Sequence, residues 1–148
     1  MLGAALAVFG YSMFFNTLAP LPTDLQTARG SIASAEANSR KGSIHTIVFT
    51  IDGRSEHFAY PGIQRDINGA WSRMKIGADA VVVFNDDDLS SQLVDVWGLE
   101  LDGRQLIEPG QALDDRRTNG RWGLALGVIS TFCAGYMWLG LRRGRRPR

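Results

Sequence analysis

The residues Trp122–Leu141 constrain the fold of this chain most, because this stretch of twenty residues contains no formally charged side chain. Its length matches the roughly 20 residues that a helix needs to cross a ~30 Å hydrocarbon layer. Trp122 and Trp138 lie near its two ends, where indole rings favour the headgroup region of a membrane. Five arginines follow at once within Arg142–Arg148. The sequence therefore predicts a transmembrane helix over residues 122–141 and a basic tail over residues 142–148.

Residues 1–19 form a second uncharged stretch. A cleaved signal peptide usually carries a basic leader, and small residues precede its cleavage site. This stretch has no basic side chain, and Pro20 would follow the cut. We therefore expect an uncleaved transmembrane helix in preference to a signal peptide. Two spans place both termini on one side of the membrane, and the arginine tail assigns that side to the cytoplasm. The predicted localisation is the bacterial cytoplasmic (inner) membrane, with an extracytoplasmic central domain.

The charges of the chain are segregated, although the formal net charge is only +1. All fifteen acidic residues lie between Asp24 and Asp115, whereas the tail is purely basic. A chain of 148 residues has room for one domain of moderate size. The only cysteine is Cys133, so no intrachain disulfide can form. The central domain must therefore be stabilised by its own hydrophobic core.

Alternating apolar residues predict a strand over residues 44–51, with Ile47 and Phe49 on one face. Asp52-Gly53 then predicts a two-residue hairpin turn. The return strand covers residues 54–60, and this register places Ile47 opposite Phe58. The hairpin therefore presents one mostly apolar face to a core.

A second strand is predicted over residues 77–84, and its consecutive valines predict burial on both faces. Another hairpin is expected about Asp102-Gly103, with Leu99 opposite Leu106. The two Asp-Gly hairpins reflect either a duplicated β unit or merely good turn formers, and we favour the second reading. The predicted core residues are Phe49, Phe58, Val81, Val83, Trp97 and Leu99.

The remaining segments complete the predicted domain organisation. Residues 20–43 are expected to form a linker with an edge strand, residues 44–110 a β-domain, and residues 111–121 a stalk. Ile67, Trp71 and Met74 have the spacing of a short amphipathic helix. The predicted fold class is two membrane-spanning helices plus a small β-rich, mainly antiparallel domain. That domain is expected to be barrel- or sandwich-like and to include the short helical element.

The sequence contains few candidates for chemistry. Asp86, Asp87 and Asp88 lack the ligand spacing of a calcium loop and are expected to form a solvated turn. His45 and His57 lie on opposite faces in the register above and are expected to be partly buried. The sequence has no G-x-S-x-G, H-E-x-x-H or C-x-x-C motif. We therefore predict no catalytic residue, no cofactor-binding residue and no metal site, and we do not expect an enzyme.

The predicted partners follow from the two uncharged stretches and the tail. Gly123 and Gly127 form a G-x-x-x-G pattern, which lets helices approach closely. Packing of the two helices within one chain is the favoured reading, and homodimerisation through Gly123 and Gly127 is the alternative. The basic tail Arg142–Arg148 is expected to contact anionic lipid headgroups, not nucleic acid. The lipid bilayer itself and a membrane protein complete the expected partners.

The strand Gly77–Phe84, followed by Asn85, three aspartates, Leu89 and Ser90-Ser91, carries a family resemblance. This layout resembles a group of small, uncharacterised bacterial membrane proteins in which two spans enclose an extracytoplasmic β-domain. In that group a similar strand runs into a turn rich in Asn, Asp and Pro, and the present chain lacks the proline. The resemblance implies a topology but no activity and no catalytic residue.

The functional expectation is a membrane-anchored, extracytoplasmic interaction or structural module of the cell envelope, without catalysis. The alternative is an accessory subunit of a transporter or channel complex.

Overall fold

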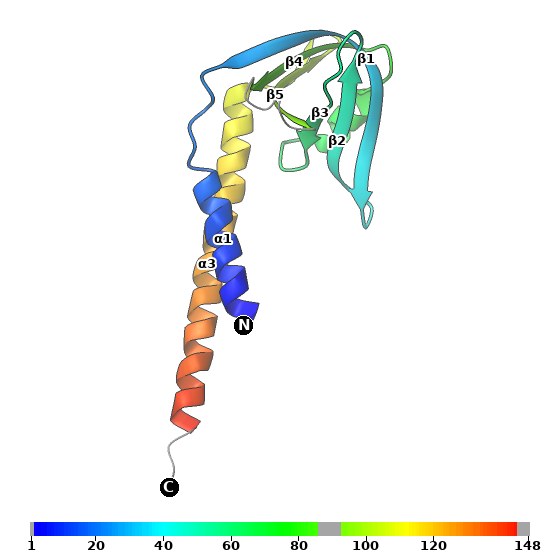
Figure 1. The fold of residues 1–148 in the computed structure, drawn as a ribbon. Helices are drawn as coiled ribbons and strands as arrows, with labels where there is room; N and C mark the ends of the chain where they lie inside the picture. The colour runs from blue at the N-terminus through cyan, green and yellow to red at the C-terminus, as the bar shows by residue number, and fades with distance from the viewer. Residues whose placement is uncertain (1, 86–92, 145–148) are drawn as a thin grey trace. The chain divides into compact units, whose positions relative to one another are not determined.

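The computed structural model describes the backbone of residues 2–85 and 93–144 (Figure 1). The chain divides into a helical unit, residues 1–20 and 116–148, and a β unit, residues 21–115. The helices are α1 (Leu2–Asn16), α2 (Ile67–Arg73) and α3 (Pro109–Gly144). The strands are β1 (Leu25–Arg40), β2 (Ser43–Ile51), β3 (Phe58–Pro61), β4 (Asp79–Asn85), β5 (Val94–Leu101) and β6 (Arg104–Ile107).

The β unit is a closed barrel. Its strand order is β3-β2-β1-β4-β5-β6, and an additional pairing between β3 and β5 closes the first five strands into a ring. The closing pair is parallel, with Phe58 opposite Val94 and Ala59 opposite Asp95, whereas the other pairs are antiparallel. The barrel is therefore mixed. The parallel pair arises because α2 and β4 intervene between β3 and β5 and bring the chain back in the same direction, and the other described pairs have the antiparallel arrangement that the sequence predicted.

The longest strand, β1, lies in a segment that the sequence analysis assigned to a linker and an edge strand. It is central instead: residues 25–31 pair with β4, and residues 32–40 pair with β2. Its fully buried side chains are Ala28 and Ile32, too few to give a strong apolar alternation. Gly30 lies close to the point where the partner of β1 changes from β4 to β2. A Cβ at this position would lie 2.6 Å from the Cγ2 of Ile51.

Two tight hairpins have positive φ at both turn residues, as a type I′ turn requires. Asp102 (φ 50°) and Gly103 (φ 74°) join β5 to β6, which confirms the predicted second turn. Lys41 (φ 52°) and Gly42 (φ 81°) join β1 to β2, and the sequence analysis did not identify this turn.

The predicted register of the first Asp-Gly hairpin is wrong by two residues. Phe49 pairs with Phe58, and Ile47 pairs with Tyr60, because β3 begins only at Phe58 and the connection from Ile51 is longer than two residues. A two-residue change preserves the face of each side chain, so Ile47, Phe49 and Phe58 still point into the core. At the second hairpin a register shift after Leu99 places this residue opposite Ile107, and not opposite Leu106.

The barrel core is built from aromatic and β-branched side chains. Phe58 lies between Phe49 and Phe84, with ring centroids 5.6 Å and 5.5 Å apart. Phe49, Phe58, Trp97 and Leu99 are buried as predicted. Val81 and Val83 are only half-buried, and Val82 and Phe84 are buried in their place. The prediction of burial on both faces of β4 is therefore wrong, because a barrel wall has only one face toward the core.

The two predicted membrane spans are contradicted by the structure. In the described part of the chain, no helix combines the length and the apolar content needed to cross a membrane. Helix α1 has 15 residues, about 22 Å at ~1.5 Å per residue, which is short of a ~30 Å layer. Residues 122–141 lack charge, but their glycines, Ser130 and Thr131 add little apolar character. The inner-membrane localisation, inferred from these spans, is corrected with them.

Candidate functional site

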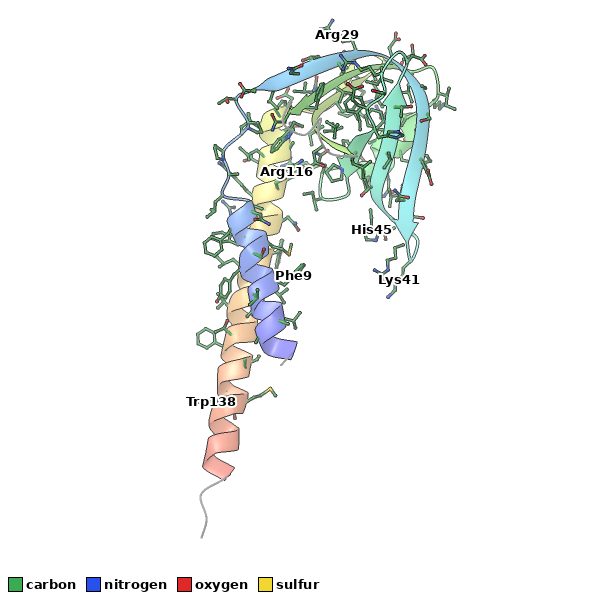
Figure 2. All side chains as sticks on the ribbon, in the orientation of Figure 1. Phe9, Arg29, Lys41, His45, Arg116 and Trp138 are labelled. Atoms are coloured by element: carbon green, nitrogen blue, oxygen red, sulfur yellow. The ribbon has the colours of Figure 1, made fainter. Side chains whose placement is uncertain are left out.

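The structure does not bring the two histidines together. His45 lies on β2 and His57 precedes β3, and both side chains are exposed, so the expected partial burial is wrong. Figure 2 shows His45 near Lys41 at one end of the barrel. Among the described residues, no group of three or more His, Cys, Asp or Glu side chains could hold a metal ion. Asp86, Asp87 and Asp88 lie outside the described residues.

The most connected polar cluster of the barrel surrounds Asp115, in the second turn of α3. Its Oδ1 accepts from the Nε of Arg65 at 2.8 Å, and its Oδ2 accepts from the backbone nitrogen of Arg65 at 3.0 Å. Asp115 is buried, whereas the side chain of Arg65 is largely exposed. The hydrogen bond to Asp115, and then its charge, raise the pKa of the Arg65 guanidinium. The Asp115 carboxylate therefore connects the segment between β3 and α2 to the start of α3 through these two hydrogen bonds.

Tyr60 extends this cluster into the barrel. Its hydroxyl donates to the carbonyl oxygen of Arg65 at 2.8 Å, and the residue is fully buried. Burial, and to a lesser extent the negative charges of Asp115 and Asp66, raise the pKa of Tyr60 to about 12. The phenol is therefore neutral at physiological pH and serves as a hydrogen-bond donor, not as a proton acceptor.

Gln64 connects the same segment to β5. Its Nε2 donates to the carbonyl oxygen of Val96 at 2.7 Å, and only 3% of the residue is exposed. The closing β3–β5 ladder ends at Ala59 and Asp95, so the amide of Gln64 supplies the next bond to β5. Tyr60, Gln64, Arg65 and Asp115 thus connect the segment after β3 to β5 and to the first two turns of α3. No local pattern could have identified this cluster, because Arg65 and Asp115 lie 50 positions apart.

In the helical unit, α1 lies alongside α3 (Figure 1), and small residues make the contact between the two helices. A Cβ at Gly10 would lie 2.5 Å from the carbonyl oxygen of Gly123 and 2.6 Å from the nitrogen of Gly127. Tyr11 and Thr131 are joined by a hydrogen bond of 3.3 Å between their hydroxyl groups. Gly123 and Gly127 therefore serve packing within one chain, the reading that the sequence analysis favoured.

Large apolar side chains of the helical unit remain exposed. Those on α1 and the residues after it are Leu6, Val8, Phe9, Phe15 and Leu18. Those on α3 are Trp122, Leu126, Val128, Ile129, Phe132, Tyr136, Met137 and Trp138. Exposed apolar residues scattered singly are normal on a protein surface, but a contiguous group indicates an interaction surface.

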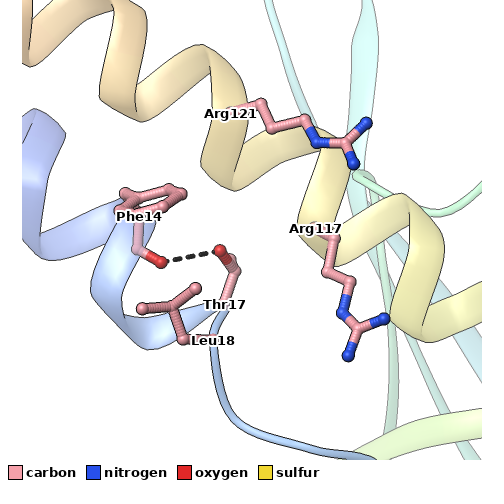
Figure 3. A pocket seen from close by; sticks show the side chains of 5 residues that line it. All are labelled: Phe14, Thr17, Leu18, Arg117 and Arg121. Carbon is pink, nitrogen blue, oxygen red and sulfur yellow. Dashed lines mark hydrogen bonds between the residues drawn. The ribbon is translucent and has the colours of Figure 1, made fainter.

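A hollow of about 360 Å³ lies where α1 ends beside α3 (Figure 3). Phe14, Thr17 and Leu18 line it from the α1 side, and Arg117 and Arg121 line it from α3. The hollow thus combines apolar side chains with two guanidinium groups. The sequence analysis noted neither arginine as a candidate ligand, because their proximity to Phe14 and Leu18 depends on the packing of the two helices.

No family model, no curated protein and no solved structure matches this chain. The expected resemblance to small two-span bacterial membrane proteins is therefore wrong. No family model supports it, and the described helices do not provide the two spans that define its layout.

Proposed function

We propose that this protein is a non-catalytic interaction module that associates with a second copy of itself through α3. The observation that carries this proposal is an outer seam on α3, defined by Trp122, Ala125, Ile129, Phe132 and Tyr136. These residues recur at alternating intervals of three and four, which is the spacing of helices that pair side by side.

The outer seam lies on the opposite side of α3 from the surface that α1 covers. The covered side contains Gly120, Gly123, Gly127 and Ser130, all of which are buried. At ~3.6 residues per turn, the two sets are about half a turn apart around the helix. A partner can therefore contact the outer seam without displacing α1. This geometry favours the outer seam over Gly123 and Gly127 as the surface for homodimerisation.

The apolar area of the outer seam is adequate for a small dimer interface. The exposed fractions are 73% for Trp122, 60% for Ile129, 76% for Phe132 and 82% for Tyr136. With aromatic side chains of ~150–250 Å² each, the outer seam can bury on the order of 600 Å² per copy. Stable interfaces bury about 800 Å² per partner, and smaller ones occur.

A second copy suits the outer seam better than an unrelated partner. No charged side chain lies between Trp122 and Tyr136, so the outer seam lacks the flanking charges that select different partners in paired helices. Two identical apolar seams are complementary to each other. The polar clusters of the described barrel are engaged in structural bonds, which supports a role other than catalysis.

The test is the mass of the full-length protein in solution, measured by sedimentation equilibrium. We expect a dimer that Ile129→Glu dissociates, because a buried unpaired carboxylate opposes pairing. Val8→Glu is the matched control, since Val8 is 70% exposed on α1 and lies outside the outer seam. A monomeric parent protein, or a dimer unaffected by Ile129→Glu, would contradict the proposal. So would recovery of a monomer bound to phosphatidylcholine vesicles or to a different protein through this face.

A further inference from the structure

We propose that the hollow lined by Phe14, Thr17, Leu18, Arg117 and Arg121 binds an anionic amphiphile, with a phosphate-type head and an alkyl chain. Both walls of the hollow belong to the helical unit. Its volume of about 360 Å³ lies within the ~300–1,000 Å³ that small-molecule sites occupy. This inference does not depend on self-association, because it rests on a different surface.

The charge of the helical unit favours an anion from outside it. Residues 1–20 and 116–148 contain eight arginines and no aspartate or glutamate. Within the part of the chain that the structure describes, neither Arg117 nor Arg121 forms an ion pair. The two residues are four positions apart and therefore lie on one side of α3. Two guanidinium groups so placed can donate several charge-assisted hydrogen bonds to a phosphate.

The carbonyl groups at the C-terminal end of α1 do not explain why Arg117 and Arg121 lie beside it. Cationic side chains often lie near the last carbonyl groups of a helix, but two of these carbonyls in α1 already accept hydrogen bonds. The oxygen of Phe14 accepts from the nitrogen of Thr17 at 3.0 Å and from its hydroxyl at 2.7 Å. The oxygen of Phe15 accepts from the nitrogen of Leu18 at 3.2 Å. The arginines are thus available to an external anion.

The apolar wall of the hollow defines the rest of the ligand. Phe14 is half-buried and Leu18 is 57% exposed, so both can lose further contact with water when a chain covers them. An inorganic anion would leave this wall uncovered, and a neutral apolar molecule would leave the guanidinium groups without a counter-ion. A phosphate ester that carries an alkyl chain and no cationic group satisfies both, because its head keeps a net negative charge. Such a molecule can be a free metabolite-sized amphiphile or the headgroup region of a lipid.

Isothermal titration calorimetry on the full chain tests the proposal. The probe is dihexanoyl phosphatidic acid below its micelle concentration, and the comparators are dihexanoyl phosphatidylcholine and inorganic phosphate. We expect phosphatidic acid to bind at least about tenfold more tightly than either comparator, because phosphatidylcholine carries a cationic group beside its phosphate and inorganic phosphate has no alkyl chain. Equal binding of phosphatidylcholine, or of inorganic phosphate, would overturn the proposal.

Variants assign the binding to the hollow. The double substitution Arg117→Gln and Arg121→Gln should weaken binding of phosphatidic acid at least about tenfold. Arg104→Gln, at the exposed first residue of β6, should leave it unchanged. If circular dichroism shows that the double variant has lost helix, the exposed single change Arg121→Gln replaces it. Leu18→Ser should weaken phosphatidic acid but not inorganic phosphate. Equal affinities for the arginine variant and the Arg104 control would contradict the proposal.

Vesicles distinguish the two sources of the ligand. Binding to vesicles of phosphatidylcholine with phosphatidic acid that depends on Arg117 and Arg121 supports a lipid headgroup as ligand. Binding of the free probe without such vesicle binding supports a free amphiphile. Vesicle binding that is unchanged by both arginine substitutions, together with no binding of the free probe, would refute the site.

Discussion

Arg65 binds Asp115 through both its guanidinium and its backbone nitrogen, at 2.8 Å and 3.0 Å. Because the second bond involves the main chain, it fixes the path of the chain after β3, and not merely one side chain. The polar segment of α3 that precedes residue 116 therefore belongs to the barrel.

Asp115→Ala should destabilise the barrel by about 1–3 kcal/mol, because it leaves the backbone N–H of Arg65 without its acceptor. The exposed neighbour Asp114 provides the control, and Asp114→Ala should change stability by less than about 0.5 kcal/mol. The measurement is urea unfolding followed by circular dichroism in the far ultraviolet. Similar midpoints for the two variants would show that the Arg65–Asp115 contact contributes little.

Tyr60 should make the barrel less stable at high pH. Its pKa is raised from 10.0 to about 12 in the folded protein, so the unfolded chain loses this proton first as the pH rises. The stabilisation is fully present below pH 10 and is lost between about pH 10 and 12. Tyr60→Phe should remove this part of the pH dependence. Denaturant unfolding from pH 8 to 11.5 checks it, and an unchanged slope in the variant would contradict the assignment.

Gly42→Val should cost about 1–3 kcal/mol, since β-branched residues are strained at the φ of +81° that the β1–β2 turn requires. Gly103→Val should cost a similar amount, because Gly103 has a φ of +74°. Gly110→Ala is the control: a Cβ there meets nothing within 4 Å. Thermal unfolding of the three variants provides the measurement. A Gly42 variant as stable as the Gly110 control would argue against a type I′ turn at this position.

Phe58→Ala should destabilise the barrel by about 3–5 kcal/mol, because its ring lies between those of Phe49 and Phe84. Phe58→Leu should cost less, since it retains part of the buried volume. Equilibrium unfolding in urea distinguishes the two. A loss well below 3 kcal/mol for the alanine variant would mean that the site collapses or that the ring is not a core residue.

Gly10→Ala should separate α1 from α3, because the added Cβ would meet the backbone of Gly123 and Gly127 at 2.5–2.9 Å. Gly135→Ala, where nothing lies within 4 Å, should be tolerated. Limited proteolysis of the full chain should then cleave the Gly10 variant faster in its helical unit, with the barrel intact. Equal cleavage of both variants would contradict close packing at Gly10.

The sequence predicted those features of the fold that depend on neighbouring residues. The alternation around Phe49 and the turn at Asp102-Gly103 were recognisable because strand period and turn conformation are local properties. The central strand β1 was expected only as a linker with an edge strand, because Ala28 and Ile32 are its only fully buried side chains and two such residues give little apolar alternation. The Lys41-Gly42 turn was missed for a related reason, since Lys is not a usual residue at positive φ.

Other features depend on contacts between distant residues, which one sequence does not reveal. The absence of charge in residues 122–141 was interpreted as a membrane span, yet Gly123 and Gly127 in this stretch pack against α1, and the glycines lower its apolar content. The side of β4 that faces the core could not be inferred from consecutive valines. The Arg65–Asp115 pair and the hollow beside Phe14 each join segments far apart in the chain.

The short parallel pairing of β3 with β5 determines how the barrel should fluctuate. The β3–β5 ladder has two residue pairs, whereas β1 and β4 share seven residue pairs. Transient opening should therefore begin between β3 and β5 and leave the other strands joined as an open sheet. The amide proton of Val94, which donates to the oxygen of His57, should exchange with deuterium sooner than those in the middle of β4.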